Sequence, residues 1–188
     1  MLKFFKLAWL LIIIMPGLSY SFDGDRKGFT ASFGLGIAPY AYWEQNTPPV
    51  DNSSVGYGFG LTIGHGWDDQ NTILFSIDGY GYKAEIFDID YTFVQGLYSA
   101  RWNHYFSPTL KSIFITAGVG IRFFGITREA KSGEVEQGNR GLGYQVGFGY
   151  QFHSNFQAGL YYSGGKTGCN DVDFQHRVVH ILLDLVAF

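Results

Sequence analysis

The stretch that decides the fold is VGYGFGLTIGHGW, residues 55–67. From Val55 to Ile63 every odd position is apolar, whereas the even positions hold only Gly and one Thr. Strict alternation predicts a β-strand, because successive side chains of a strand point to opposite faces of the sheet. The stretch therefore predicts a strand with one large apolar face and one face of very small residues.

The same two-residue period recurs along the rest of the chain. Residues 29–37, 113–123 and 142–152 alternate as regularly as the first stretch. Four further segments alternate less regularly, namely 72–82, 91–106, 156–163 and 175–188. The total of about eight is an even number, as in bacterial outer-membrane barrels, and most segments reach the roughly 9–11 residues that a tilted strand needs to cross a bilayer.

The small-residue face determines the class of barrel. Charged residues are 15% of the chain, aromatic residues 19%, and 26 of 188 residues are Gly, about twice the usual share of Gly. Small residues fit the crowded inside of a narrow barrel, and the apolar face then meets lipid. We therefore predict an all-β, eight-stranded antiparallel up-and-down transmembrane β-barrel. A secreted lipocalin-like barrel is the alternative, but it would carry Lys and Glu on its outer face.

The first residues have the pattern of a secretory signal peptide. Lys3 and Lys6 precede a short apolar run, and small residues end at Ser21. We predict a signal over residues 1–21 and a barrel domain over 22–188. Removing the signal takes away two lysines, so the net charge changes from −3 to 11 − 16 = −5. This negative charge argues against a nucleic-acid partner.

The connections between the segments alternate between short and long. Short turns are expected at 68–71, 107–111 and 153–155, and longer loops at 39–54, 83–90, 124–139 and 164–174. Outer-membrane barrels have short periplasmic turns and long outer loops. This pattern predicts that both termini lie in the periplasm.

Aromatic residues near the predicted strand ends suggest two girdles at the membrane interfaces. The expected periplasmic girdle comprises Trp67, Trp102, Phe106, Phe152 and Phe156, and the expected outer girdle comprises Tyr40, Trp43, Tyr57, Tyr91 and Phe123.

The predicted lumen face holds few ionisable residues. Asp78, Arg101 and Arg122 should point inward together with Gln95 and Gln145. Hairpin symmetry places Gln95 opposite both Asp78 and Arg122, which predicts a row Asp78–Gln95–Arg122. A structural network that satisfies buried charge and a ligand-selecting role both remain open. Six inward rings should fill the space left by the glycines and exclude a wide pore: Tyr80, Tyr82, Phe93, Tyr105, Phe114 and Tyr161.

The chain ends on Phe188. With the signal peptide, the alternating strands and the loop pattern, it resembles the small outer-membrane β-barrel proteins of the OmpA-like transmembrane type. The resemblance implies that Phe188 belongs to the signal read by the barrel-assembly machinery, and that lipids and lipopolysaccharide are partners. Alternation favours Asp184 pointing inward, so we predict a bulge or local twist that turns Phe188 back toward lipid.

Two classes of function remain open. The first is a non-enzymatic barrel that serves envelope structure, surface interaction, or binding or passage of a small hydrophobic molecule. The second is a lipid A-modifying acyl hydrolase, whose pattern places His two residues before a late-strand Ser; here Tyr161 precedes Ser163. His176, His180 and Asp184 are spaced roughly 13 Å apart on a strand, too far for a relay. No motif for a cofactor or metal is present, and Cys169 is expected to be a loop thiol.

Overall fold

The computed structural model describes residues 26–46, 49–86, 89–128, 137–169 and 172–188. The predicted signal peptide, residues 1–21, lies outside the described residues. The described chain forms eight strands: β1 (Gly28–Asn46), β2 (Pro49–Gly66), β3 (Asn71–Ile86), β4 (Ile89–Tyr105), β5 (Ser112–Arg128), β6 (Gln137–His153), β7 (Phe156–Cys169) and β8 (Val172–Ala187).

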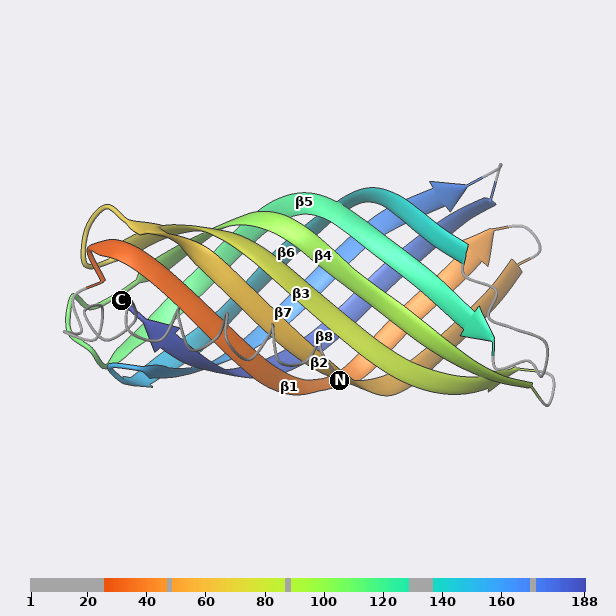
Figure 1. Ribbon diagram of the computed structural model, residues 1–188, viewed down its shortest axis with the longest axis horizontal. Coiled ribbons are helices and arrows are strands. Elements are labelled where there is room, and N and C mark those ends of the chain that lie inside the picture. The colour runs from red at the N-terminus through yellow and green to blue at the C-terminus, as the bar shows by residue number, and fades with distance from the viewer. Residues whose placement is uncertain (1–25, 47–48, 87–88, 129–136, 170–171) are drawn as a thin grey trace, which may run out of the picture.

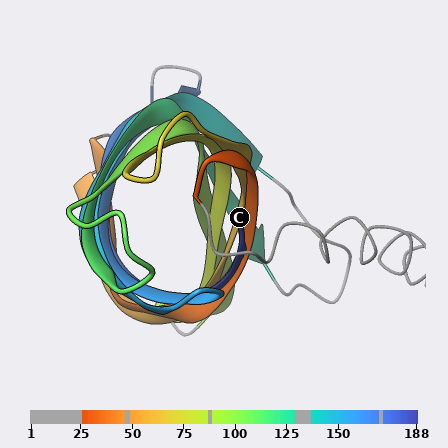
Figure 2. The same cartoon turned by 90° about the vertical axis from the view of Figure 1, so that its left-hand side faces the viewer.

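The strands close into a single barrel, as predicted. Each strand pairs antiparallel with the next, and β8 returns to pair with β1. Figure 1 shows the strands crossing the barrel at a tilt, and Figure 2 shows the closed ring from one end. Among the residues described, no helix is long and apolar enough to cross a membrane.

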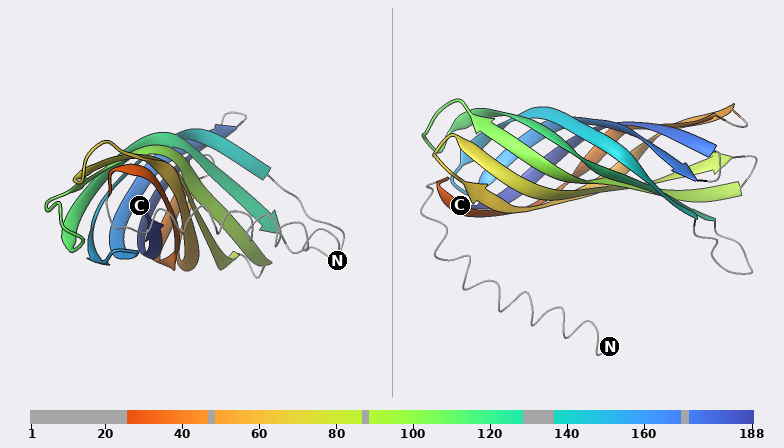
Figure 3. Two further views of the ribbon diagram at one scale, coloured as in Figure 1. Left: turned by 60° about the vertical axis from the view of Figure 1, so that its left-hand side comes forward. Right: turned by 90° about the horizontal axis from the view of Figure 1, so that it is seen from above.

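The strands are longer than the sequence pattern predicts. They contain 14 to 19 residues, and β1 pairs with β2 as far as Asn46↔Pro49. The expected long loops 39–54, 83–90 and 164–174 are therefore wrong, because strand pairing continues through most of each segment. Only about 9–11 residues of each strand are needed to cross a bilayer. In a bilayer, strands of this length would project beyond it, and we call the end opposite the three short turns and the C-terminus the projecting end (Figure 3).

The three short turns are confirmed at that other end. The connections are residues 67–70, 106–111 and 154–155. In the first turn, the Asp68 carboxylate accepts hydrogen bonds from the backbone N–H groups of Gln70 (2.8 Å) and Asn71 (2.7 Å). Such side-chain acceptors stabilise tight turns.

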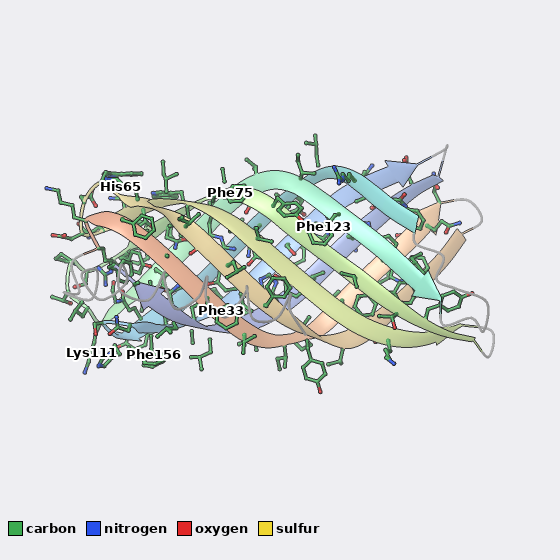
Figure 4. All side chains as sticks on the ribbon, in the orientation of Figure 1. Phe33, His65, Phe75, Lys111, Phe123 and Phe156 are labelled. Carbon is green, nitrogen blue, oxygen red and sulfur yellow. The ribbon has the colours of Figure 1, made fainter. Side chains whose placement is uncertain are left out.

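The two faces of the barrel wall differ as predicted. Large apolar side chains lie outside, with Leu142 82% exposed, and Figure 4 shows Phe33, Phe75 and Phe123 projecting from the wall. Glycines leave room inside for rings: a side chain at Gly58 would overlap the ring of Tyr80. All six predicted inward rings are buried: Tyr80, Tyr82, Phe93, Tyr105, Phe114 and Tyr161.

An irregularity in β1 shows that one predicted girdle residue, Trp43, was placed on the wrong face. The pairing of β1 with both neighbours shifts between Ile37 and Ala41. Such a bulge reverses the alternation, because one extra residue moves the following side chains to the other face. Tyr40 is therefore exposed, whereas Trp43 is only 3% exposed and lies in the lumen.

Tyr91 is a second correction. It shares the inward parity of Phe93 and packs against the buried rings inside the barrel instead of facing lipid. Of the remaining girdle residues, Phe123 is half-buried. The other six are exposed: Tyr57, Trp67, Trp102, Phe106, Phe152 and Phe156. Their membrane-interface role stays a prediction.

The end of β8 confirms one expectation and corrects another. Asp184 points inward and is buried. Phe188 also points inward, at 4% exposure, and packs edge-on against Tyr105 with a centroid distance of 6.2 Å. No register shift interrupts the pairing of β8 with β1 from Asp184 to Ala187, so nothing turns Phe188 toward lipid. Its role as an assembly signal stays a prediction.

Candidate functional site in the barrel lumen

A buried ion pair lies in the middle of the lumen. Arg101 of β4 and Asp78 of β3 form a salt bridge through Nη2 and Oδ2. Arg101 Nη2 also donates to Gln145 Oε1 (3.0 Å), and Ser76 Oγ donates to Asp78 Oδ2 (3.3 Å). Both charged side chains are almost fully buried. Pairing and hydrogen bonding are what make burial of two charges tolerable.

The network continues to the opposite wall through His180 of β8. Its Nε2 lies 2.7 Å from Tyr80 Oη and 3.2 Å from Gln145 Nε2. The amide nitrogen can only donate, so we assign Nε2 as the acceptor and place the imidazole proton on Nδ1. The ring of Tyr161 stacks on His180 at 5.0 Å, and the Arg101 guanidinium lies 5.3 Å from the same Tyr161 ring. The lumen is therefore bridged from β3 to β8.

Arg122 forms a second polar layer. Its Nη2 donates to Gln95 Oε1 (2.8 Å), and its Nη1 lies 3.4 Å from Ser163 Oγ. Gln95 Nε2 in turn donates to Tyr82 Oη (3.3 Å). Arg122 is fully buried. Among its described hydrogen-bond partners there is no carboxylate, so neutral oxygens solvate this guanidinium.

The predicted row Asp78–Gln95–Arg122 is corrected in register. Asp78 pairs with Leu97, and Leu97 pairs with Arg122, while Gln95 lies opposite Tyr80. The shift is two residues across both hairpins, so Asp78, Gln95 and Arg122 keep their predicted inward face. Gln95 does bind Arg122, but Asp78 pairs with Arg101 instead.

Beyond Arg122, toward the projecting strand ends, an aromatic cluster fills the lumen. We call it the outer aromatic cluster, and it consists of Trp43, Phe93, Phe124 and Phe174. The ring of Trp43 lies 5.4 Å from Phe93, 5.9 Å from Phe124 and 6.1 Å from Phe174. The ring of His176 lies tilted beside that of Phe124, with a centroid distance of 4.6 Å.

At the turn end, Arg26 closes the mouth of the barrel. Its Nε donates to Gln151 Oε1 (2.8 Å), and its Nη atoms donate to the carbonyl oxygens of Asp69 (2.7 Å), Ser107 (2.8 Å) and Thr109 (2.6 Å). The guanidinium also lies 4.0 Å from the Tyr105 ring centroid. Sequence reasoning missed Arg26, because it precedes the first strand and no alternation sets its direction.

The residues considered for acyl hydrolysis do not form a catalytic arrangement. Ser163 Oγ is buried beside Arg122. His176 Nε2 contacts Thr167 Oγ1 (2.8 Å), and Asp184 accepts from Gln157 Nε2 (3.2 Å). Each is an interior polar residue, as the strand spacing suggests.

Two further features bear on chemistry. A Ser–His contact of 3.0 Å joins Ser154 and His153, but it lies in an exposed turn between neighbouring residues. Within the part of the chain that the structure describes, no three His, Cys, Asp or Glu side chains gather so as to hold a metal ion. Cys169 is the last residue of β7.

Comparison with known proteins gives one family. A family model described as outer membrane protein β-barrel domain matches residues 7–181. No curated protein matches significantly. Among solved structures, Ail of Yersinia pestis, crystallised with the heparin analogue sucrose octasulfate, has a TM-score of 0.59 at 14% identity, over 84% of this chain and 99% of that one. Neisserial surface protein A has a TM-score of 0.58 at 15% identity, over 86% and 97%. At these identities the likeness concerns the fold alone.

Proposed function

This chain belongs to the outer membrane protein β-barrel family, and from that premise we propose a non-enzymatic barrel with a sealed lumen that serves envelope structure and surface interaction. The family match makes it an integral outer-membrane barrel. The sealed lumen and the projecting strands support the finer role.

The observation that carries the proposal is the filling of the lumen at three levels. Arg26 and Tyr105 occupy the turn end, the Asp78–Arg101 network occupies the middle, and the outer aromatic cluster occupies the projecting end. The inward side chains at all three levels are at most a few per cent exposed. An eight-stranded barrel is just narrow enough for its own side chains to fill it. Side chains therefore occupy the space inside the backbone ring of Figure 2, which supports a lumen without an aqueous channel.

We also propose an orientation. The turn end, which holds the C-terminus, faces the periplasm, since short turns are periplasmic in such barrels. The long projecting strands then stand outside the cell, where they provide a surface for interaction. The apolar outer wall contacts lipid, and we propose that the assembly machinery reads β8 with Phe188 before β8 pairs with β1.

Bilayer conductance tests the sealed lumen. The full barrel in a planar bilayer should give no steady ohmic current. A variant that combines Arg26→Ala, Asp78→Ala, Arg101→Ala, Trp43→Ala and Phe124→Ala should conduct, because it loses side chains at all three levels of the lumen. Trp102→Phe on the outer wall is the control and should stay silent. A steady current through the wild-type barrel would contradict the proposal.

The lipid A hydrolase alternative has its own test. Among the described residues, the hydrogen bond found for Ser163 Oγ comes from Arg122, and His176 and His180 bind other groups. The acyl pattern of lipid A, measured by mass spectrometry, should therefore be the same with and without the protein. Loss of an acyl chain from lipid A that depends on Ser163 would favour the hydrolase alternative.

A second candidate function has one observation in its favour. A shallow, mostly apolar groove lies on the outer wall of β3–β6, and its lining includes Ile73, Ala100, Trp102, Ala117 and Tyr144. A small hydrophobic molecule could bind there without entering the lumen. Binding of a fluorescent apolar probe should then fall when Ala117→Phe fills the groove.

A further inference from the structure

Three cationic side chains lie together on the outside of the barrel, near the projecting strand ends. They are Arg140 of β6, Lys166 of β7 and Arg177 of β8, and we call them the basic cluster. All three are exposed and alternate with buried, inward-facing neighbours. They therefore stand on the same wall that carries the lipid-facing apolar side chains, and not in the lumen.

The strand register brings the three charges close together. Arg140 lies opposite Gly168, and Arg177 lies opposite Gly164. Lys166 is placed between these two glycines on β7, so it is a diagonal neighbour of both arginines. Diagonal neighbours on adjacent strands are about 7–8 Å apart. The glycines place no side chain between the charges, so the surface there is open to a ligand.

The cluster is only partly neutralised by the protein itself. Within the described residues, no hydrogen bond or ion pair is found for Arg140 or Lys166, and Arg177 lies 5.8 Å from the ring of Tyr42. Two carboxylates share this face: Asp173 is a diagonal neighbour of Lys166, and Glu44 is a diagonal neighbour of Arg177. The three cations outnumber them, in a chain whose net charge is −3.

The margin of the cluster contains a hollow of about 230 Å³. Its lining is Glu44, Asn46, Lys166, Asp173 and Gln175. Carboxylates and amides accept hydrogen bonds from hydroxyl groups, whereas Arg and Lys bind phosphate by charge-assisted hydrogen bonds. The combination of the two sets suits a sugar that carries phosphate.

The position of the cluster identifies where such a ligand comes from. Apolar and aromatic side chains lie below it on the same strands, including Leu142, Tyr144 and Tyr162, whose tyrosine rings are 6.2 Å apart. Aromatic side chains of this kind mark the level of lipid headgroups. We propose that the basic cluster and its hollow bind the headgroup of a phosphorylated glycolipid in the outer leaflet. This inference rests on the orientation given under the proposed function.

Lipid retention tests this site. The full barrel would be reconstituted in phosphatidylcholine vesicles that contain diphosphorylated lipid A, then extracted in mild detergent, and the bound lipid counted by native mass spectrometry. The variant Arg140→Gln/Lys166→Gln/Arg177→Gln should retain at least about tenfold less lipid A, since each lost charged hydrogen bond is worth about a factor of ten. Lys83→Gln on β3, on the opposite wall, is the matched control and should retain it normally.

The lipid arms separate the possible ligands. Dephosphorylated lipid A and phosphatidylglycerol should both be retained poorly, and excess inorganic phosphate should not displace lipid A. Equal retention of lipid A by the wild type and the folded triple variant would overturn the proposal. Strong retention of phosphatidylglycerol would overturn the assignment of the ligand as a glycolipid. If the triple variant does not fold, each of the three single variants should retain less lipid A than the wild type. Single variants that retain as much lipid A as the wild type would also overturn the proposal. Conductance is measured separately, so a leaky lumen would refute the proposed function without touching this site.

Discussion

The middle and the outer end of the lumen are sealed by different physical means. In the middle, Asp78, Arg101 and His180 meet through charged and polar hydrogen bonds. At the outer end, Trp43 and Phe124 pack through ring contacts alone. A polar network depends on every partner, because a buried charge without its partner is costly. An aromatic cluster loses stability in proportion to the volume removed. The two regions should therefore respond differently to substitution.

The largest effect is expected in the middle. Arg101→Leu leaves the Asp78 carboxylate buried without its partner and should lower the free energy of unfolding by about 3–5 kcal/mol. Urea unfolding in lipid vesicles, followed by tryptophan fluorescence, measures this loss. The double variant Asp78→Asn/Arg101→Met removes both charges and should recover most of the stability. If the double variant is as unstable as the single one, the cost does not come from an unpaired charge.

The outer aromatic cluster should show a smaller and additive loss. Phe124→Ala creates a cavity among the rings and should cost about 3 kcal/mol by the same assay. Phe148→Ala on the outer wall is the matched control. It should cost less, because lipid chains fill the space that the ring leaves. Equal losses at both positions would mean that Phe124 is not packed inside the barrel.

Arg26 combines the two modes at the turn end, since it donates hydrogen bonds and also lies on the Tyr105 ring. Arg26→Ala should cost about 2 kcal/mol, because water can reach the released carbonyl groups at the mouth. Lys111→Ala in the neighbouring turn should change stability by no more than about 0.5 kcal/mol. An equal effect of the two substitutions would show that Arg26 does not hold the turns together.

The smallest effect concerns the turn itself and depends on pH. Desolvation raises the pKa of Asp68, but hydrogen bonds from Asn71 and Gln70 outweigh it and hold the pKa below its ordinary value of 3.8. A lowered pKa in the folded state stabilises the fold at neutral pH, and this contribution is lost as pH falls through the folded pKa. The stability difference between the wild type and Asp68→Ala should therefore be full at pH 7 and shrink below pH 3.8. A difference independent of pH would rule out the carboxylate as its source.

The sequence was sufficient for the strands, the closed barrel and the face of almost every side chain, because a two-residue period records which side of the wall a residue faces. It placed Asp78, Arg101, Arg122, Gln95 and Gln145 in the lumen. It could not identify Arg101 as the partner of Asp78. Alternation fixes the face of a residue, but a shift of two residues between paired strands leaves every face unchanged, so the register is not determined. The β1 bulge that turns Trp43 inward, and the inward Phe188, depend on local backbone geometry that the period does not encode. Arg26 lies outside any alternating segment.

The most direct test of the account measures whether each tryptophan side chain is in contact with lipid, with water or with neither. After removal of residues 1–21, the chain keeps Trp43, Trp67 and Trp102, so paired Trp→Phe substitutions give single-tryptophan barrels. Trp102, 38% exposed on the wall, should be quenched strongly by brominated lipid, whereas Trp43, 3% exposed, should resist both brominated lipid and aqueous acrylamide. Quenching of Trp43 as strong as that of Trp102, or a Trp102 that brominated lipid does not reach, would contradict a barrel with an apolar wall in lipid and a packed lumen.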